Sequence, residues 1–224
     1  VVVAGHPKAT GEMPEAMYDA GMGIAGLTCV FTIQAKDAAG NSWTKDSRDA
    51  FLVQLVGPSV LMGDVKNNLN GTYTCAYFPT KAGCYDMTVL LRERAIKGAP
   101  FRVDVIAGRT SSGACVVDGE GIERAVAGKE CLAHIHAKDQ YGNGITWSES
   151  VAREVGFTFE MVHCAGLANS KRGSPFSSEA DSRVRGTVLD CQDGTFRVSY
   201  YAKRTGVYTL NCVGTFDGQP LMGC

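Results

Sequence analysis

The stretch GMGIAG, residues 21–26, has the glycine pattern G-x-G-x-x-G that holds a pyrophosphate in dinucleotide-binding proteins. That chemistry needs a strand before the glycines and a helix after them, because the helix N-terminus must face the phosphates. Here residues 27–37, LTCVFTIQAKD, follow the glycines, with β-branched and aromatic residues in alternation. We therefore expect a second strand, a glycine turn and no cofactor-binding site.

His134 and His136 form the second chemical candidate, because two histidines spaced by one residue on a strand point to the same face and can share a metal ion. Their neighbours Cys131, Ala133 and Ile135 have the parity of the buried face. The histidines should then lie on the outer face, and the sequence offers no third ligand beside them. We expect no metal site.

Other signals of catalysis or charged ligands are missing from the sequence. It contains no G-x-S-x-G, H-E-x-x-H or P-loop arrangement, so we expect no catalytic residues and no enzymatic activity. The 22 basic and 23 acidic residues give a net charge of -1, which favours neither nucleic acid nor an anionic membrane as a partner. No apolar run reaches the roughly 18 residues that span a bilayer. Direct membrane contact by this segment is not expected.

The segments that would form the strands around any site occur twice, as an internal repeat of the sequence. AGLTCVFTIQAKD from Ala25 matches AGKECLAHIHAKD from Ala127, and GTYTCAYFPTKAGCYDMTV from Gly71 matches GTFRVSYYAKRTGVYTLNC from Gly194. Each copy of about 100 residues holds several short alternating runs separated by Gly, Asn, Asp and Pro, which is typical of an immunoglobulin-like β-sandwich. GEMPEAMYDAG, residues 11–21, is the one weak helical candidate.

The ordered set of motifs resembles the filamin-type immunoglobulin-like repeat. It comprises GMGI at 21–24 with its counterpart GEGI at 119–122, FTIQAKD at 31–37, LVGPS at 55–59, GTYTCAYFPTKAGCYDMTV at 71–89 and IKGAPFRVDV at 96–105. The resemblance implies an all-β fold of tandem immunoglobulin-like β-sandwiches of filamin type. We expect the last strand of a preceding repeat at 1–5, one repeat at 6–108 and a second at 109–224, joined by a short linker at 108–113. The second copy departs from the pattern through a Ser/Gly-rich insertion at about 164–186 and the lack of its last strand.

The resemblance implies a non-enzymatic structural scaffold and protein–protein interaction module, part of a long multi-repeat cytoskeletal or ciliary-type protein in the cytoplasm. The alternative is an extracellular adhesion ectodomain on a cell or gamete surface, favoured by the nine cysteines and the sequon at Asn70. No C-x-x-C pair occurs, so zinc ribbons and redox motifs are not indicated. We expect Cys131 and Cys212 to be unbridged, because they are staggered along their strands and Val89 replaces Cys212 in the first copy. Tyr85 and Tyr208 resemble the tyrosine corner.

The family's docking mode implies that partners add a strand along the open edge of strand C, residues 51–56, and its neighbour strand D, or that neighbouring repeats cover this edge. On that strand Leu52, Gln54 and Val56 should face outward, and we take these three as the candidate partner-binding residues. The second copy has Thr158, Glu160 and Val162 there and should bind less well. The expected core of the first copy comprises Phe31, Ile33, Phe51, Val53, Leu55, Tyr73, Tyr77, Tyr85, Met87 and Val89.

Overall fold

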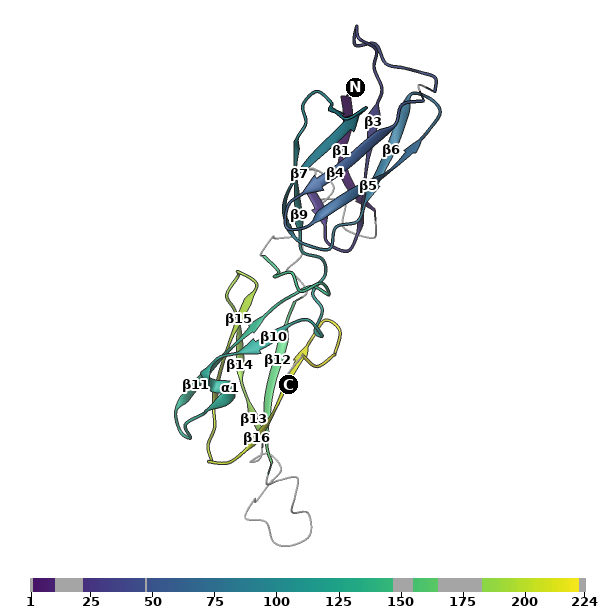
Figure 1. Ribbon diagram of the computed structural model, residues 1–224. Helices are drawn as coiled ribbons and strands as arrows, with labels where there is room; N and C mark the ends of the chain where they lie inside the picture. Colours follow the sequence, from purple (N-terminus) through teal and green to yellow (C-terminus); the bar gives the residue numbers. More distant parts are fainter. Residues whose placement is uncertain (1, 11–21, 47, 147–154, 165–182, 222–224) are drawn as a thin grey trace. The chain divides into compact units, whose positions relative to one another are not determined.

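The computed structural model describes residues 2–10, 22–46, 48–146, 155–164 and 183–221, which form two β-rich units (Figure 1). The first unit spans Val1–Gly108 and the second Arg109–Cys224. Apart from α1 (Glu120–Glu123), the elements of the described residues are β-strands, which confirms the all-β prediction. No helix among these residues is long and apolar enough to cross a bilayer. The helical candidate at 11–21 lies outside the described residues.

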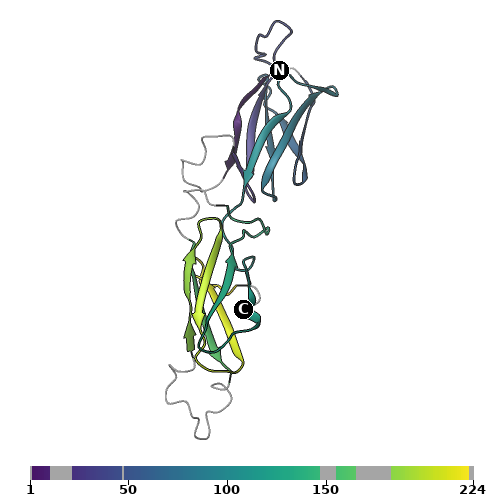
Figure 2. The ribbon, with the colours of Figure 1, turned by 90° about the vertical axis from the view of Figure 1, so that its left-hand side faces the viewer.

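The first unit is a β-sandwich whose strands lie in two layers (Figure 2). The sheet path runs β1-β3-β6-β5-β4-β7-β9-β2, and β8 pairs with β7. All the pairs are antiparallel except β2 with β9. The strands are β1 (Val2–Thr10), β2 (Met22–Ile24), β3 (Thr28–Gln34), β4 (Phe51–Val56), β5 (Val60–Asn67), β6 (Thr72–Tyr77), β7 (Gly83–Leu91), β8 (Arg94–Ala95) and β9 (Phe101–Ile106).

Strand β5 belongs to both layers, and Gly63 is the residue at which it changes layer. Its first half pairs with β4, up to Gly63 opposite Val53, and its second half pairs with β6 from Asp64 onward. A Cβ atom at Gly63 would lie 2.5 Å from the Cys75 Sγ and 2.9 Å from the Val53 Cβ. Only glycine leaves room for this crossing of the core.

The core of the first unit follows the predicted alternation closely. Nine of the ten expected residues are buried, with Ile33, Val53 and Tyr85 fully enclosed. The exception is Phe51, which is half-buried at the start of β4. Its ring still packs edge-on against Tyr73, with 4.8 Å between the centroids. Phe51 thus closes the end of the core and does not lie inside it.

The first strand corrects one expectation about the repeat boundary. The sequence predicts the last strand of a preceding repeat at 1–5, whereas in the structure β1 runs through Val2–Thr10 as a strand of the first unit. It pairs antiparallel with β3, Val2 opposite Gln34 and Thr10 opposite Thr28, with a shift of register between Ala4 and Lys8. These residues therefore contribute the first strand of the first sandwich.

The second unit repeats this architecture with two smaller sheets. One has the order β10-β11-β15-β14 and the other β13-β12-β16. The neighbouring strands are antiparallel. The strands are β10 (Val116–Asp118), β11 (Glu130–His136), β12 (Phe157–His163), β13 (Arg183–Arg185), β14 (Thr187–Asp190), β15 (Thr195–Tyr201) and β16 (Tyr208–Gly214).

The insertion expected at about 164–186 is not a loop over its whole length. Its last residues form β13, which pairs with β12, while residues 165–182 lie outside the described part of the chain. Gly186 then separates β13 from β14, which pairs with β15 in the other sheet. Gly186 occupies the position of Gly63, and a Cβ there would lie 2.7 Å from the Phe159 ring. Both units therefore pass a strand between their layers at a glycine.

The expected linker at 108–113 is partly built into the second unit. Thr110 forms a bridge with Asp139, and the Ser112 Oγ donates a hydrogen bond to the Asp217 Oδ1 at 2.7 Å. Ser112 is fully buried. Thr110 and Ser112, which were expected in the linker, therefore belong to the second unit.

Candidate partner-binding surface

The turn between β4 and β5 is fixed to β7 by packing and hydrogen bonds. Gly57 opens it and lies so close to β7 that a Cβ would be 2.5 Å from the Cys84 carbonyl oxygen and 2.8 Å from the Tyr85 ring. The Ser59 Oγ lies 2.9 Å from the Tyr85 hydroxyl, which itself donates to the Lys81 carbonyl at 2.9 Å. The hairpin of β4 and β5 is thus held in one position.

This hairpin carries an apolar outer face. Leu52 and Val56 on β4 are 46% and 51% exposed, and Val60 and Met62 on β5 are 61% and 55% exposed. Val56 lies opposite Val60 and Gln54 opposite Met62, so the side chains stand next to one another across the two strands. We call these five residues the outer hairpin face: Leu52, Gln54, Val56, Val60 and Met62.

The three candidate residues on β4 therefore lie on the outer side, but the premise about their backbone is wrong. Val53–Val56 pair with β5 on one side of β4, and the whole strand pairs with β7 on the other. Strand C is therefore not an open edge over these residues. Among the described residues, the edge of this layer is the first half of β5, Val60–Gly63.

The borders of the outer hairpin face carry charge. On β7, Asp86 lies opposite Val56, while Leu90 lies opposite Leu52 and continues the apolar surface. On β5, Asp64 follows directly after the crossing glycine and is exposed. An apolar centre with a polar border is the usual composition of a protein-binding surface.

The second unit has ion pairs at the matching positions. Glu160 on β12 replaces Gln54, and on β13 Arg183 and Arg185 replace Val60 and Met62. The Glu160 carboxylate lies 3.4 Å from the Arg183 Nη1 and 3.6 Å from the Arg185 Nε. The two repeats share a fold and differ in the chemistry of this surface, apolar in the first and charged in the second.

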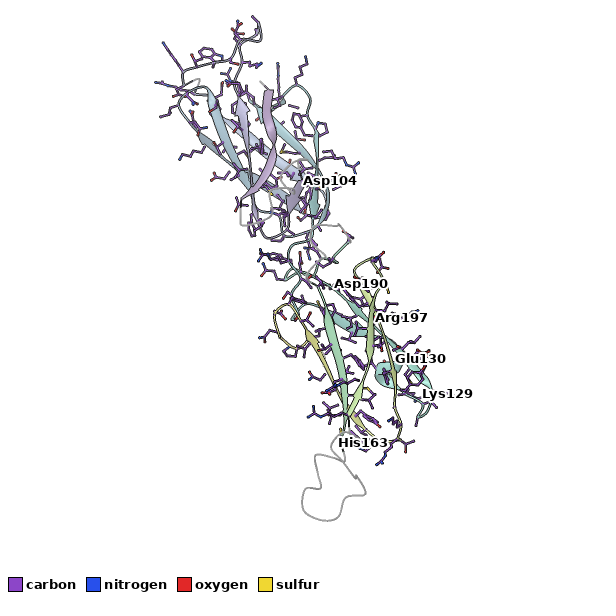
Figure 3. The ribbon with its side chains drawn as sticks, turned by 180° about the vertical axis from the view of Figure 1, so that it is seen from behind. Asp104, Lys129, Glu130, His163, Asp190 and Arg197 are labelled. Carbon is purple, nitrogen blue, oxygen red and sulfur yellow. The ribbon has the colours of Figure 1, made fainter. Side chains whose placement is uncertain are left out.

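The other chemical candidates are structural. On β11, Cys131, Ala133 and Ile135 are buried and the two histidines are half-exposed, which confirms their predicted parity. The His136 Nε2 lies 3.0 Å from the Asp118 Oδ2, and His134 lies opposite Arg197, whose place on β15 Figure 3 shows. Within the described residues, no cluster of three His, Cys, Asp or Glu residues could hold a metal ion.

The glycine motif and the tyrosines also have structural roles. Gly26 adopts a φ of 85° in the turn between β2 and β3, and the segment that follows it is a strand, as predicted. The helix that a phosphate-binding turn requires is therefore not there. The Tyr208 hydroxyl donates to the Arg204 carbonyl at 3.0 Å, in the same i to i−4 arrangement as Tyr85 to Lys81. Both tyrosines thus form the predicted corner.

The eight described cysteines are not disulfide-bonded, and most of them are buried. Burial raises the pKa of the Cys75 thiol to about 12, and burial is also the main cause of the raised pKa of Cys29 and Cys115. Thiols with such pKa values stay protonated at neutral pH and are poor nucleophiles. These side chains act as small hydrophobic residues of the core.

The two units share one fold, and each has a tyrosine corner and a strand that changes layer at a glycine. A match to a known family agrees with this repeated architecture. The profile described as the Filamin/ABP280 repeat matches residues 4–102 and again 109–224. This chain belongs to the filamin repeat family. Its repeats make it a structural and protein-interaction module.

Curated relatives show the same similarity. The chain is 25% identical to rat (Rattus norvegicus) Filamin-C over 196 residues, 83% of this chain and 6% of Filamin-C. It is 34% identical to the mouse (Mus musculus) E3 ubiquitin-protein ligase TRIM45 over 82 residues, 35% of this chain and 14% of TRIM45. The chain therefore spans a small part of each relative's length.

Among solved structures, the Escherichia coli adhesin FdeC is similar in fold. Its TM-score is 0.50 at 18% identity, and the match covers 99% of this chain and 64% of the FdeC chain. At this level of identity the likeness concerns the fold alone.

Reasoning from the sequence missed the half of the outer hairpin face that lies on β5. Val60 and Met62 are apolar residues at alternate positions directly after the GPS turn, so a hairpin reading of VGPSVLM would have placed them beside Val56 and Gln54.

Proposed function

We propose that this chain is a non-enzymatic segment of a cytoskeletal scaffold, and that its first repeat binds another protein through the outer hairpin face. The observation that carries the proposal is the exposure of four apolar side chains on two adjacent strands, Leu52, Val56, Val60 and Met62. Single exposed hydrophobic residues are normal on a protein surface, but a contiguous apolar group is typical of interaction sites.

The comparison between the repeats supports a specific role for this face. Both units need the same hairpin for their fold, and the second unit builds it with one glutamate and two arginines on the outside. Apolar side chains at these positions are therefore not a requirement of the fold. We infer that the first repeat presents them to a partner and that the second repeat does not.

The partner's main chain can bind at the neighbouring edge. The first half of β5 pairs with β4 on one side, and no described residue pairs with it on the other. An extended peptide could add to Val60–Gly63 through main-chain hydrogen bonds. Its side chains would then reach Val60 and Met62 on the outer side. The strand-addition hypothesis therefore moves from β4 to the neighbouring edge of β5. A neighbouring repeat could supply the same contacts.

The cytoskeletal assignment is supported by the similarity to Filamin-C over most of this chain. We propose no role for nucleic acid, a cofactor or direct membrane contact in this segment.

The experiment replaces the apolar residues of the outer hairpin face in the first repeat with the charged residues found at the matching positions of the second. A chain with Gln54→Glu, Val60→Arg and Met62→Arg carries the ion-pair set that the second unit already folds with. Partners captured on the wild-type chain are purified, and their affinity for both chains is compared. We expect the triple variant, and Leu52→Lys with Val56→Lys, to bind at least about tenfold more weakly, about 1.4 kcal/mol.

The control for added charge is Leu189→Arg, which places an arginine on an exposed strand position of the second unit. It should bind like the wild type. If the triple variant keeps its fold by circular dichroism and binds every captured partner undiminished, the outer hairpin face is not the binding site.

A further inference from the structure

The turn between β5 and β6 carries an asparagine followed by a glycine, Asn70–Gly71. Asn70 is exposed at the tip of the turn, and Gly71 adopts a φ of 83°. Such a pair is chemically reactive, because a glycine has no side chain to keep its backbone nitrogen away from the side-chain carbonyl carbon of the asparagine before it. The sequence contains one further pair of this kind, Asn143–Gly144, in the second unit.

The side-chain oxygen of Asn70 accepts two hydrogen bonds from a single residue. The Thr72 N–H donates to the Asn70 Oδ1 at 3.1 Å, and the Thr72 hydroxyl donates to the same oxygen at 2.6 Å. The first of these bonds folds the asparagine side chain back over the peptide bond to Gly71, as in an Asx turn. The Thr72 hydroxyl accepts from the Asn68 Nδ2 at 3.0 Å, so its own hydrogen is available to Asn70. Two donors on a carbonyl oxygen stabilise the negative charge that develops there when a nucleophile attacks the carbon.

The nucleophile and the leaving group at this turn are both unengaged. Within the described residues, no hydrogen bond uses the Gly71 N–H or the Asn70 Nδ2. Gly71 is buried and is held through its carbonyl, which accepts from the Ala35 N–H at 2.9 Å and from the Gln34 Nε2 at 3.1 Å. A buried N–H without an acceptor costs free energy. Ring closure onto Asn70 would remove that cost, because the nitrogen of the cyclic imide carries no hydrogen.

The other pair has the opposite setting. Asn143 is buried, and its Nδ2 donates to the Asp139 Oδ2 at 2.7 Å. Its backbone N–H donates to the other oxygen of the same carboxylate at 2.9 Å. The side-chain nitrogen of Asn143 must therefore give up a buried, charge-assisted hydrogen bond before it can leave. The chain thus contains a reactive pair and a protected pair of the same sequence.

The second repeat shows that this turn accommodates a carboxylate. Asp193 occupies the position of Asn70, and its Oδ1 accepts from the Thr195 hydroxyl at 2.5 Å and from the Thr195 N–H at 2.9 Å. These two bonds lower the pKa of Asp193, in that order of size. The following Gly194 has a φ of 88°, close to that of Gly71. An aspartate in place of Asn70 therefore fits the same backbone and the same hydrogen bonds.

We propose that Asn70 is a site of spontaneous deamidation in the folded first repeat, promoted by the Thr72 hydroxyl. The Gly71 nitrogen forms a bond to the Asn70 Cγ and gives up its proton to water. The bond from Cγ to Nδ2 breaks, and the nitrogen takes up a proton and leaves as ammonia. Water then opens the cyclic imide to aspartate or isoaspartate. One water is consumed, one ammonia is released and nothing is oxidised.

The two products differ in their fit to the turn. Aspartate restores the arrangement seen at Asp193, whereas isoaspartate inserts an extra carbon into the main chain between Asn70 and Gly71. A Cβ on Gly71 would lie only 2.0 Å from the Trp43 carbonyl oxygen, so the chain has no room to shift there. We expect aspartate to leave the stability of the first unit unchanged and isoaspartate to lower it. The site does not overlap the outer hairpin face, so this proposal does not depend on the proposed function.

The experiment incubates the 224-residue chain at mildly alkaline pH and follows the peptides around Asn70 and Asn143 by mass spectrometry, with synthetic peptides to identify isoaspartate. In the folded chain we expect Asn70 to convert at least about tenfold faster than Asn143. In concentrated urea the two rates should become similar, because both asparagines then precede an unconstrained glycine. The rate at Asn70 should rise with pH, since the attacking nitrogen must lose its proton.

A matched pair of variants tests the Thr72 hydroxyl. Each rate is divided by the rate of the same variant in urea, which removes the effect of the local sequence. Thr72→Val should then convert at least about threefold more slowly than the wild type, less than in an enclosed oxyanion hole because this turn is exposed. Thr72→Ser keeps the donor and should convert like the wild type. Asn70→Asp should unfold at the same urea midpoint as the wild type.

The proposal is overturned if Asn70 in the folded chain converts no faster than Asn143. A Thr72→Val protein that converts at the wild-type rate, after division by its rate in urea, would equally overturn it, because the hydroxyl would then not promote the reaction. A lower urea midpoint for Asn70→Asp would contradict the fit of the carboxylate to the turn.

Discussion

The Ser59 Oγ lies 2.9 Å from the Tyr85 hydroxyl, and this contact ties the β4–β5 turn to strand β7. The same hydroxyl donates to the Lys81 carbonyl, so one phenol joins two turns of the first unit. In the second unit, Tyr208 keeps the bond to the Arg204 carbonyl. The two tyrosines thus offer a matched pair for measuring what the turn contact contributes.

We expect Tyr85→Phe to lower the free energy of unfolding of the first unit by about 1–3 kcal/mol, because both hydroxyl contacts are lost and Ser59 loses its partner. Tyr208→Phe removes a contact at an exposed rim and should cost the second unit under about 1 kcal/mol. Urea unfolding, followed separately in each unit by hydrogen exchange, measures both. Equal losses would contradict a stabilising role of the Ser59 contact.

Gly63→Ala should destabilise the first unit by about 1–3 kcal/mol, because the added methyl group would lie 2.5 Å from the Cys75 Sγ. Adding Cys75→Ala should recover part of this loss, while the contact with the Val53 Cβ remains. Gly113→Ala is the control, since no atom lies within 4 Å of its new Cβ. A Gly63→Ala protein as stable as the wild type would show that β5 crosses between the layers without needing the glycine.

The alternation of residue types was enough to predict the strands and their buried faces. On β3, Phe31 and Ile33 alternate with polar residues, and the structure buries both. The internal repeat then predicted two sandwiches, because each copy of about 100 residues carries enough short strands for one. These features depend on neighbours along the chain, which the sequence shows directly.

The features that escaped prediction depend on contacts far apart in sequence. VLMGDVKN reads as one strand, and nothing local shows that it pairs with β4 before Gly63 and with β6 after it. Likewise GMGI and GEGI differ by a single residue but form a strand and a helical turn. Met22–Ile24 pair with β9, a partner some 80 residues further along the chain that the four letters of the motif do not specify.

Asp217 provides a test that depends on pH. Partial desolvation opposes ionisation, but hydrogen bonds from the Gln219 N–H and from Ser112 outweigh it and lower the pKa of the carboxyl. A carboxyl with a lowered folded-state pKa stabilises the fold above its unfolded pKa of about 3.9, and this contribution is lost as the pH falls through the folded value.

We therefore expect Asp217→Asn to destabilise the second unit at pH 7, and the difference from the wild type to shrink progressively below about pH 4. Thermal unfolding at a series of pH values measures this difference. Asp190→Asn, at the end of β14, serves as the control for loss of one negative charge. If the difference in stability stayed constant down to pH 2, the negative charge of Asp217 would not be what stabilises the second unit.

Cys84 is exposed on β7, but its thiol should react slowly. Partial desolvation and then a hydrogen bond to Asp104 raise its pKa, so the thiolate is a minor form at pH 8. Asp104 lies opposite it on β9 and is labelled in Figure 3. Asp104→Asn should speed alkylation of Cys84 by iodoacetamide by about two- to fivefold. Asp64→Asn, on the outer side of β5, should leave the rate unchanged, and an equal rate in all three proteins would contradict the role of Asp104.

The last prediction concerns Cys131 and Cys212, the pair that a secreted protein could bridge. They lie on different sheets, Cys131 opposite Tyr200 on β15 and Cys212 opposite Phe159 on β12, and both thiols are buried and unbridged. The first unit has Val89 where the second has Cys212, so the fold does not need a bridge there. We expect protein purified from its native source under alkylating conditions to have the same intact mass with and without prior reduction, and all thiols to be alkylated after unfolding.

The Cys131→Ser variant should then lose stability only through its lost packing and should not respond to reductant. A peptide containing Cys131 linked to one containing Cys212 would contradict this prediction, and it would favour the extracellular adhesion alternative over the cytoskeletal scaffold.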